Sequence, residues 1–260
     1  MASSQHGKFV WYELMTSDSA AAQSFYAGVL GWQMRDAGMP GMRYTLCAVG
    51  ERTLGGIMDL PPALAADGTP PCWSGYVAVD DVDASAGRVR QAGGAVHREP
   101  EDIPGVGRFA VVADPQGAVL MLFKDSSGEA MPAVVPGTPG HVGWHELYAD
   151  DWPAALAFYA DLFGWSRGTA VDMGPMGTYQ LFACGAGGAE VGGMMNRPAG
   201  VPGPCWLYYF NVAAVDAAVA RVTGLGGQVL NGPMQVPGGS WIVQCADPQG
   251  AAFALVGPTR

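Results

Sequence analysis

The chain consists of two sequence repeats, and most of their shared motifs are offset by 133 residues. Trp11-Tyr12-Glu13-Leu14 returns as Trp144-His145-Glu146-Leu147. Four further motifs recur at the same offset: Phe25-Tyr26 as Phe158-Tyr159, Gly31-Trp32 as Gly164-Trp165, Pro71-Cys72-Trp73 as Pro204-Cys205-Trp206, and Asp114-Pro115-Gln116-Gly117 as Asp247-Pro248-Gln249-Gly250. Gly55-Gly56 departs from this offset, because it matches Gly192-Gly193 at 137. Solenoid repeats are much shorter, so the pattern indicates a duplicated domain.

The composition fits two globular domains and excludes several partners. The chain has 260 residues, of which 49% are apolar and 14% charged, and each half is long enough to bury its own core. A net charge of −10 argues against nucleic acid or an anionic membrane surface as partner. No run approaches the roughly 18 apolar residues of a membrane span, and the start is short and polar, so we expect a cytoplasmic protein. Five cysteines without a Cys-x-x-Cys motif indicate neither a disulfide framework nor a zinc site.

Each repeat is predicted to contain the element order βαβββ twice. In the first repeat, hydrophobic periodicity and turn residues predict strands at 9–15, 32–35, 44–49, 54–58, 76–79, 95–97, 109–113 and 119–123, with helices following Asp18 and over 82–92. Gly31 is the expected C-cap of the first helix. We predict domains at 7–125 and 140–257, joined by a linker at 126–139 that is rich in Gly, Pro and Ser.

The repeated motifs resemble those of the vicinal oxygen chelate superfamily, which includes glyoxalase I, extradiol dioxygenases and bleomycin-resistance proteins. The motif Phe25-Tyr26-x4-Gly31-Trp32, its twin in the second repeat, Val79-Asp80-Asp81-Val82-Asp83-Ala84 and the Asp-Pro-Gln-Gly hairpins carry this resemblance. Residues 102–109 are similar to tandem two-domain glyoxalase-like proteins of the mycobacterial culture-filtrate antigen type, often labelled hydroxylases. The resemblance implies an α+β fold with four βαβββ modules. These would form two glyoxalase-like domains, each a curved eight-stranded mixed sheet around a cavity.

In metal-using members, the resemblance implies one ligand from each of four strands, drawn from His, Glu or Gln. The matching positions here hold other residues: Trp11, Ser74, Met121 and a place within Gly56–Met58 in the first repeat, and Trp144, Leu207, Ala254 and a place within Gly193–Met195 in the second. None is the imidazole or carboxylate that divalent ions require. His145 follows Trp144 and is expected on the opposite face of its strand. We therefore expect no metal and no cofactor.

The sheet face that bears these positions is predicted to bind an organic molecule instead. Because side chains alternate along a strand, Glu13 shares the face of Trp11, and Glu146 shares the face of Trp144. The predicted ligand-binding residues are Trp11, Ser74, Tyr76, Met121, Phe123, Trp144, Tyr148, Tyr209 and Asn211. Glu13 and Glu146 are the candidate catalytic residues. Mostly apolar walls with a few polar groups are typical of small-molecule pockets.

Several functions remain open at this point. The first is a binding protein of the bleomycin-resistance type that takes a flat, hydrophobic or aromatic small molecule. The second is a metal-independent lyase, isomerase or hydroxylase-like enzyme in which Glu13 or Glu146, its pKa raised by burial, acts as general base. A metal-dependent glyoxalase or dioxygenase and a surface or interaction protein are further alternatives. The aromatic faces could also be plain core, with each glutamate paired to an arginine such as Arg43 or Arg108. A monomer or a homodimer is expected.

Overall fold

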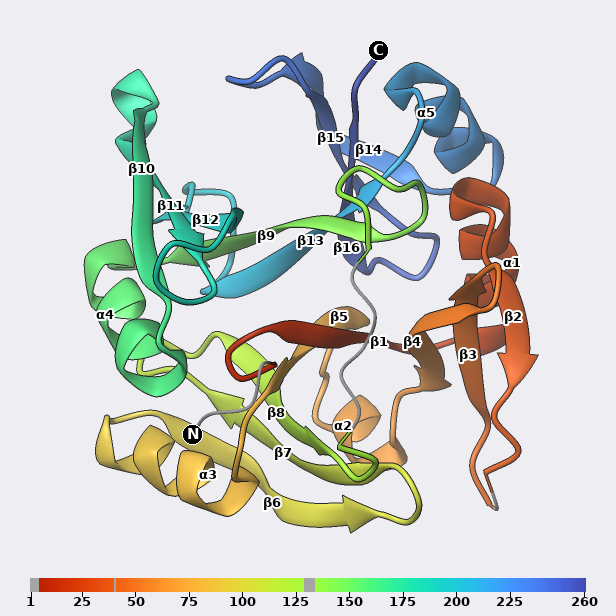
Figure 1. Ribbon diagram of the computed structural model, residues 1–260. Helices are drawn as coiled ribbons and strands as arrows, with labels where there is room; N and C mark the ends of the chain where they lie inside the picture. The colour runs from red at the N-terminus through yellow and green to blue at the C-terminus, as the bar shows by residue number, and fades with distance from the viewer. Residues whose placement is uncertain (1–4, 40, 129–133) are drawn as a thin grey trace. The chain divides into compact units, whose positions relative to one another are not determined.

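The computed structural model describes residues 5–39, 41–128 and 134–260 and has an α+β fold (Figure 1). The first repeat contains β1 (Phe9–Thr16), α1 (Ser19–Leu30), β2 (Gln33–Asp36), β3 (Tyr44–Val49), β4 (Arg52–Asp59), α2 (Pro62–Ala66), β5 (Cys72–Ala78), α3 (Val82–Gln91), β6 (Ala95–Ile103), β7 (Gly107–Ala113) and β8 (Val119–Asp125). The second contains β9 (Val142–Ala149), α4 (Trp152–Phe163), β10 (Ser166–Asp172), the short 3-10 helix η1 (Gly174–Met176), β11 (Thr178–Ala183), β12 (Glu190–Asn196), β13 (Cys205–Asn211), α5 (Val215–Gly224), β14 (Gln228–Gln235), β15 (Trp241–Ala246) and β16 (Ala252–Gly257). Residues 129–133 of the predicted linker lie outside the described residues.

Each repeat forms one mixed sheet, as the predicted fold class requires. Within the described residues, the first repeat gives an eight-stranded sheet of order β2-β3-β4-β1-β5-β8-β7-β6, and the second gives β10-β11-β12-β9-β13-β16-β15-β14. The pairs β1–β4 and β5–β8 are parallel, whereas β2–β3, β3–β4, β6–β7 and β7–β8 are antiparallel. Neither sheet closes into a barrel. The fold class and the repeated βαβββ order are therefore confirmed.

Local sequence signals account for the helix ends. The Asp18 side chain accepts a hydrogen bond from the Ala21 backbone N–H and caps α1, as short polar side chains do at helix starts. Gly31 ends α1 with φ of 72°, a left-handed conformation that glycine adopts without steric cost. The stretch after Pro61 contains the short helix α2, for which the sequence analysis expected no helix or strand. Its proline at the first helical position suits a helix start, because the missing N–H has no partner there anyway.

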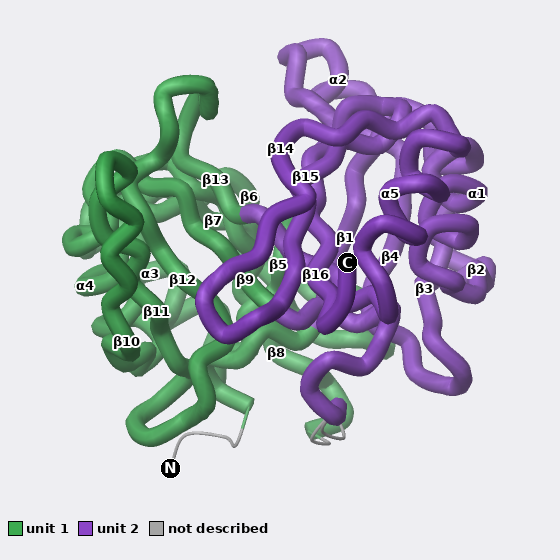
Figure 2. The backbone as a smooth tube through the Cα atoms, turned by 90° about the horizontal axis from the view of Figure 1, so that it is seen from above, with its two compact units in different colours: residues 1–10, 74–133, 144–206 green, residues 11–73, 134–143, 207–260 purple. Residues whose placement is uncertain are grey.

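The described chain divides into two compact units, and each unit combines one module from each repeat (Figure 2). Unit 1 comprises residues 1–10, 74–133 and 144–206, and so holds most of β5 to β12. Unit 2 comprises residues 11–73, 134–143 and 207–260, and so holds most of β1 to β4 and β13 to β16. In unit 1, α3 packs against β6, β7 and β8. In unit 2, α1 packs against α5 and β4.

The repeated motifs meet in the core of each unit. In unit 2, the buried Tyr26 hydroxyl donates to the Asp247 carboxylate at 3.1 Å and accepts the Trp73 indole N–H at 2.8 Å. Tyr26 and Trp73 come from the first repeat, whereas Asp247 comes from the second. Burial raises the pKa of Asp247, and its other oxygen accepts the backbone N–H groups of the Asp-Pro-Gln-Gly hairpin. The motifs that carry the family resemblance therefore hold two repeats together.

Unit 1 has the same network with the repeats exchanged. Tyr159 from the second repeat donates to Asp114 from the first at 3.0 Å, and the Trp206 indole donates to the Tyr159 hydroxyl at 3.3 Å. Phe9, Trp165 and other rings surround this network with centroids 4.5–6.1 Å apart, in the range of favourable aromatic contacts.

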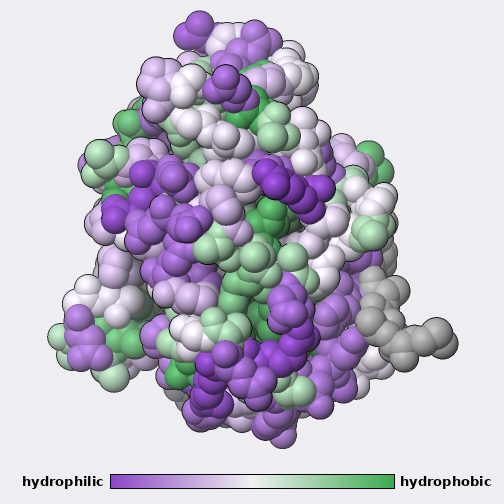
Figure 3. Space-filling view, turned by 90° about the vertical axis from the view of Figure 1, so that its left-hand side faces the viewer, coloured by the Kyte–Doolittle hydropathy of each residue, from purple (hydrophilic) through white to green (hydrophobic). Residues whose placement is uncertain are grey.

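Part of the apolar composition reaches the surface. The face shown in Figure 3 has hydrophobic residues near its centre, between hydrophilic ones. Among the described residues, Val135, Leu230 and Met176 are large hydrophobic side chains that are 55–75% exposed. Scattered apolar exposure of this kind is ordinary for folded proteins. No helix in the described part of the chain combines the length and apolarity needed to cross a bilayer.

Candidate functional site

A hydrogen-bonded group of three side chains lies at the predicted binding face of β1 in unit 2. The Trp11 indole N–H donates to the Tyr44 hydroxyl at 3.0 Å, and that hydroxyl donates to the Glu13 carboxylate at 2.8 Å. Glu13 is 7% exposed, and Trp11 is half-buried. Trp11 and Glu13 lie on the same face of β1, as predicted, because both bond to Tyr44, which reaches them from β3. Tyr44 thus gives the buried carboxylate a donor, which its burial requires.

The repeated Gly-Gly pair makes room for this tyrosine. A Cβ atom on Gly56 would overlap the ring and hydroxyl of Tyr44, and one on Gly55 would overlap the Tyr12 carbonyl oxygen on β1. Gly55 pairs with Tyr12, and Gly56 pairs with Glu13, in the parallel β1–β4 ladder. The first glycine therefore permits close approach of the two strands, and the second leaves the space that the Tyr44 ring fills.

Unit 1 repeats the arrangement on β9, β11 and β12. The Trp144 indole donates to the Tyr179 hydroxyl at 2.7 Å. Burial, and then the charge of the nearby Glu146 carboxylate, raise the pKa of Tyr179 well above its usual value. Tyr148 adds to the same effect and therefore lies near this hydroxyl. A Cβ on Gly193 would overlap the Tyr179 ring. We call Trp11–Tyr44–Glu13 and Trp144–Tyr179–Glu146 the two Trp–Tyr–Glu clusters.

Alanine at Gly56 should dislodge Tyr44 and break this cluster. We expect Gly56→Ala to lower the free energy of unfolding by about 1–3 kcal/mol, the usual cost of overpacking. In urea titrations, Gly56→Ala combined with Tyr44→Ala should cost less than the sum of the two single changes, because the clash is then absent. Gly87 on α3 has open space around its Cβ position, so Gly87→Ala is the control and should leave stability equal or higher. Additive costs in the double variant would contradict this packing.

The sequence analysis missed both tyrosines. Tyr44 and Tyr179 are repeat mates at an offset of 135, between the offsets of 133 and 137 that flank them. The two tyrosines were not matched because neither an offset of 133 nor one of 137 aligns Tyr44 with Tyr179. An alignment with one two-residue gap before Tyr44 and a second between Tyr44 and Gly55 would have placed a tyrosine opposite a tyrosine.

The predicted residues on β5 and β8 share one face in unit 1. Tyr76 pairs with Met121, and the Tyr76 and Phe123 rings meet edge to face at 5.9 Å. Ser74, Tyr76 and Met121 are nearly fully buried. Phe109 pairs with Phe123 and carries the Arg98 guanidinium 4.9 Å above its ring. This face is aromatic. Arg98 and its ion-pair partner Glu101 both belong to β6, the strand next to β7.

The corresponding face in unit 2 is more polar. Gln244 on β15 donates to the Tyr209 hydroxyl at 3.0 Å, across Ala254, which pairs with both residues. The small side chain of Ala254 leaves room for that bond. The Asn211 amide lies over Gly143, where a Cβ would overlap it. The two repeats therefore build different surfaces on their second modules, as the contrast between Met121 and Ala254 implies.

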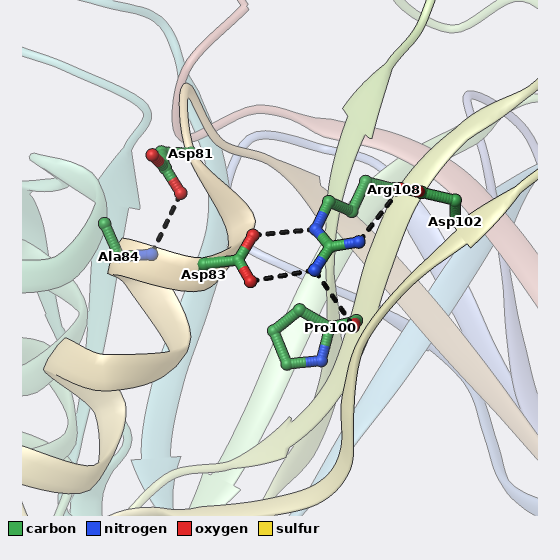
Figure 4. Close-up of polar contacts among 6 residues, drawn as sticks. All are labelled: Asp81, Asp83, Ala84, Pro100, Asp102 and Arg108. Carbon is green, nitrogen blue, oxygen red and sulfur yellow. Dashed lines mark hydrogen bonds and ion pairs between the residues drawn. The ribbon is translucent and has the colours of Figure 1, made fainter.

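Arg108 does not pair with either glutamate of the clusters. Its guanidinium forms a fork with both carboxylate oxygens of Asp83 at 2.7 and 2.8 Å, and also binds Asp102 at 2.9 Å (Figure 4). A further bond reaches the Pro100 carbonyl oxygen at 3.1 Å. These bonds raise the pKa of Arg108 and lower that of Asp83. The alternative that Arg108 neutralises Glu13 or Glu146 is wrong, because Arg108 ties α3 to the β6–β7 hairpin.

The side chains at the ligand positions of metal-using members do not fit a metal ion. The Tyr44 ring covers Gly56, the Tyr179 ring covers Gly193, and the two tryptophans donate their N–H groups to these tyrosines. Indole and aliphatic groups have no lone pair to give a divalent ion. Across residues 5–39, 41–128 and 134–260, no three or more His, Cys, Asp or Glu side chains gather as a metal site would need. The expectation that the protein binds no metal stays a prediction.

Comparison with known proteins identifies the family. The sequence profile described as Glyoxalase/Bleomycin resistance protein/Dioxygenase superfamily matches residues 8–122 and 138–255. The chain belongs to this superfamily. It is 35% identical to the protein named "Putative glyoxylase CFP32" of Mycobacterium tuberculosis (strain CDC 1551 / Oshkosh) over 251 residues, 95% of this chain and 94% of that protein. The family match to two successive regions of this chain confirms the tandem arrangement predicted from the repeat.

The chain is also similar to an anthracycline biosynthesis protein and to a glyoxalase of known structure. The chain is 35% identical over 266 residues to the anthracycline biosynthesis protein DnrV of Streptomyces peucetius, covering 96% of this chain and 93% of DnrV. Among solved structures, the Mn(II)-bound glyoxalase from Novosphingobium aromaticivorans matches with a TM-score of 0.66 and 18% identity. That match covers 99% of this chain and 83% of the glyoxalase. At this identity the glyoxalase shows a shared superfamily fold and nothing about metal or substrate.

Proposed function

We propose that this protein binds a planar aromatic small molecule at its Trp–Tyr–Glu clusters. The observation that carries the proposal is the repetition of one indole, one phenol and one carboxylate where metal-using relatives place ligands. Trp11 and Trp144 are half-buried, so part of each indole surface remains accessible to a flat ligand. Stacking on such rings contributes affinity at low entropic cost, and the buried carboxylate can orient a ligand.

The named relatives support an aromatic ligand. DnrV and the similar DauV of Streptomyces sp. strain C5 are named for anthracycline biosynthesis, and anthracyclines are polycyclic aromatic compounds. Four further aromatic residues were predicted to contribute to binding, and of these Phe123 is half-buried while the others are buried: Tyr76, Phe123, Tyr148 and Tyr209. The proposal therefore takes a flat, largely apolar molecule as ligand.

Glu13→Gln and Glu146→Gln test the role of the carboxylates. Glutamine keeps the shape and can still accept the tyrosine hydrogen bond, but it removes the negative charge. We expect either change to weaken binding of an aromatic ligand by about 1–3 kcal/mol, the scale of a hydrogen bond to a charged group. Isothermal titration calorimetry measures this loss, and urea unfolding should show an intact fold. Unchanged affinity in both variants, together with higher stability, would favour the plain-core interpretation.

A metal-independent enzyme is the second candidate, favoured by the Tyr44–Glu13 bond. A hydroxyl that donates to a carboxylate at 2.8 Å provides an acid and a base side by side, which general acid–base catalysis needs. Glu13 or Glu146 would then take a proton from the bound molecule. Mass spectrometry of a ligand incubated with the protein separates the two candidates. A binding protein returns the ligand unchanged, whereas an enzyme produces a new mass or an isomer with a new retention time.

A further inference from the structure

We infer that Asn231 is a modification site, at which the side-chain amide is converted to a carboxylate through attack by the backbone nitrogen of Gly232. The reaction is intramolecular, consumes only water and does not depend on the proposed function. The sequence around Asn231, the irregular pairing of β14 and the exposure of this strand together carry the inference.

Asn231 is the one asparagine in the chain that precedes a glycine. The sequence contains three asparagines, and the other two, Asn196 and Asn211, precede an arginine and a valine. A side chain on the following residue crowds the path of the backbone nitrogen toward the asparagine amide, whereas glycine has no Cβ and leaves that path open. Of the three asparagines, Asn231 is therefore the one best suited to react.

The strand leaves its regular ladder directly after Asn231. Between the pairs Asn231–Gln244 and Met234–Ile242, two residues of β14 stand opposite one residue of β15, which is the arrangement of a β-bulge. Gly232 has a φ of 92°, and a Cβ on it would lie 2.9 Å from the Ile242 carbonyl oxygen. This bulge therefore favours, right after Asn231, the residue type that makes an asparagine reactive.

Water and base reach this part of β14 from solution. Within the described residues, β14 is the last strand of its sheet, and Asn231 and Gly232 are both exposed. The Asn231 amide donates to the Gln244 side-chain oxygen at 3.5 Å, a long and hence weak bond. The matching bulge of the first repeat contains Arg98-Glu99-Pro100, which has neither the amide nor the glycine. The reactive pair is therefore specific to the second repeat.

The reaction forms one carbon–nitrogen bond and breaks another. The Gly232 nitrogen gives its proton to solvent, and its electron pair attacks Cγ of Asn231. Nδ2 takes up a proton from solvent and leaves as ammonia, so a cyclic imide remains. Water then opens the imide at one of its carbonyl carbons, which yields either aspartate or isoaspartate, whose main chain runs through Cγ. In total, one water is consumed, one ammonia is released and one negative charge appears.

The conversion alters the hydrogen bonds on the second-module face of unit 2. Gln244 accepts from Asn231 and donates to the Tyr209 hydroxyl at 3.0 Å. A carboxylate has no donor, so the Gln244 oxygen loses this partner and faces a negative charge instead. Repulsion then favours the reversed Gln244 amide, whose oxygen accepts from Tyr209. The new charge also lies within residues 222–246, a stretch without Asp, Glu, Lys or Arg.

Peptide mapping of the full-length protein tests the inference. Trypsin, which cuts after Lys and Arg unless Pro follows, yields one peptide, 222–260, with Asn231 and another, 168–221, with Asn196 and Asn211. The folded protein is incubated for several days at pH 9 and at pH 6, and an unincubated sample corrects for conversion during digestion. At pH 9, peptide 222–260 should gain the mass difference between water and ammonia at least about tenfold faster than peptide 168–221, a barrier about 1.4 kcal/mol lower. The gain should be slower at pH 6, because the attacking nitrogen loses its proton less readily.

Asn231→Gln is the matched control, because the longer side chain keeps the amide but would have to close a larger ring. Peptide 222–260 of this variant should keep its mass. The intramolecular route also predicts isoaspartate, which isoaspartyl methyltransferase detects by transferring a methyl group to it. Aspartate without isoaspartate would indicate direct hydrolysis and overturn the inference. A mass gain in Asn231→Gln, or conversion of the natural chain only in urea, would overturn it as well.

Discussion

Replacing Asp247 with alanine should lower the free energy of unfolding by about 3–5 kcal/mol, through the loss of several hydrogen bonds to one buried carboxylate. One Asp247 oxygen accepts the Tyr26 hydroxyl, and the other accepts the backbone N–H groups of Gln249 and Ala251. Alanine leaves these donors buried without a partner. Tyr26→Phe removes only the hydroxyl and should cost about 1–3 kcal/mol.

Urea or guanidinium unfolding of the variants measures these losses. Asp114→Ala is the matched change in unit 1, because Asp114 binds Tyr159 and its own hairpin in the same way. It should cost a similar amount. Asp67→Ala changes an exposed aspartate at the end of α2 and should stay within about 0.5 kcal/mol. A loss below about 1 kcal/mol for both Asp247→Ala and Asp114→Ala would show that these networks do not hold the repeats together.

Acid should destabilise the protein through His145, over the range from about pH 6.5 to pH 4. The imidazole is stacked on Phe9 at 4.0 Å, and its Nδ1–H donates to the Val191 carbonyl oxygen at 2.7 Å. Burial lowers the pKa of His145 from 6.5 to about 4. Between these values the unfolded chain binds a proton that the folded chain does not, so stability falls as pH falls. A shift of this size corresponds to about 3 kcal/mol.

His145→Phe isolates this contribution from the carboxylates that titrate in the same range. The variant loses the bond to Val191 and starts less stable at pH 7.5. Its disadvantage relative to the unaltered protein should shrink by about 3 kcal/mol when both are measured at pH 4. His97→Gln, which changes an exposed histidine, should show no such convergence. Parallel pH profiles for His145→Phe and the unaltered protein would mean that His145 binds its proton equally well in the folded and unfolded states, so that burial does not lower its pKa.

The sequence predicted most of what depends on neighbours along the chain. Asp18 and Gly31 end α1 as expected, and the strand at 44–49 has the predicted bounds. His145 packs with Phe9 in the core of unit 1 while its neighbour Trp144 binds Tyr179, as the period of two requires. Strand β2 is shifted by one residue from its predicted range. The strand that most exceeds its predicted length is β6, because an exposed edge strand lacks a clear hydrophobic pattern.

Contacts between residues that are far apart in the sequence were not predicted. The role of Gly56 needs the position of the Tyr44 ring, and the role of Asp247 needs Tyr26, 221 residues away. Hydrophobic patterns show which face of an element is buried, but not which element buries it. The repeat predicted two domains along the chain, whereas each compact unit takes modules from both repeats. The predicted boundaries at 7–125 and 140–257 stay a prediction, since each repeat does supply a whole sheet.

The exchange of modules between repeats has a consequence for synthesis on the ribosome. The first module of unit 2 ends at residue 73, and its remaining main segment begins only at residue 207. At the usual elongation rates of about 5–20 residues per second, the 133 intervening residues take roughly 7–27 s. Throughout this interval the rings of Phe25 and Tyr26 lack one of their partners, Phe253, against which they pack in the folded protein. Unit 2 therefore completes its core only after the segment 207–260, which includes Phe253, has been synthesised.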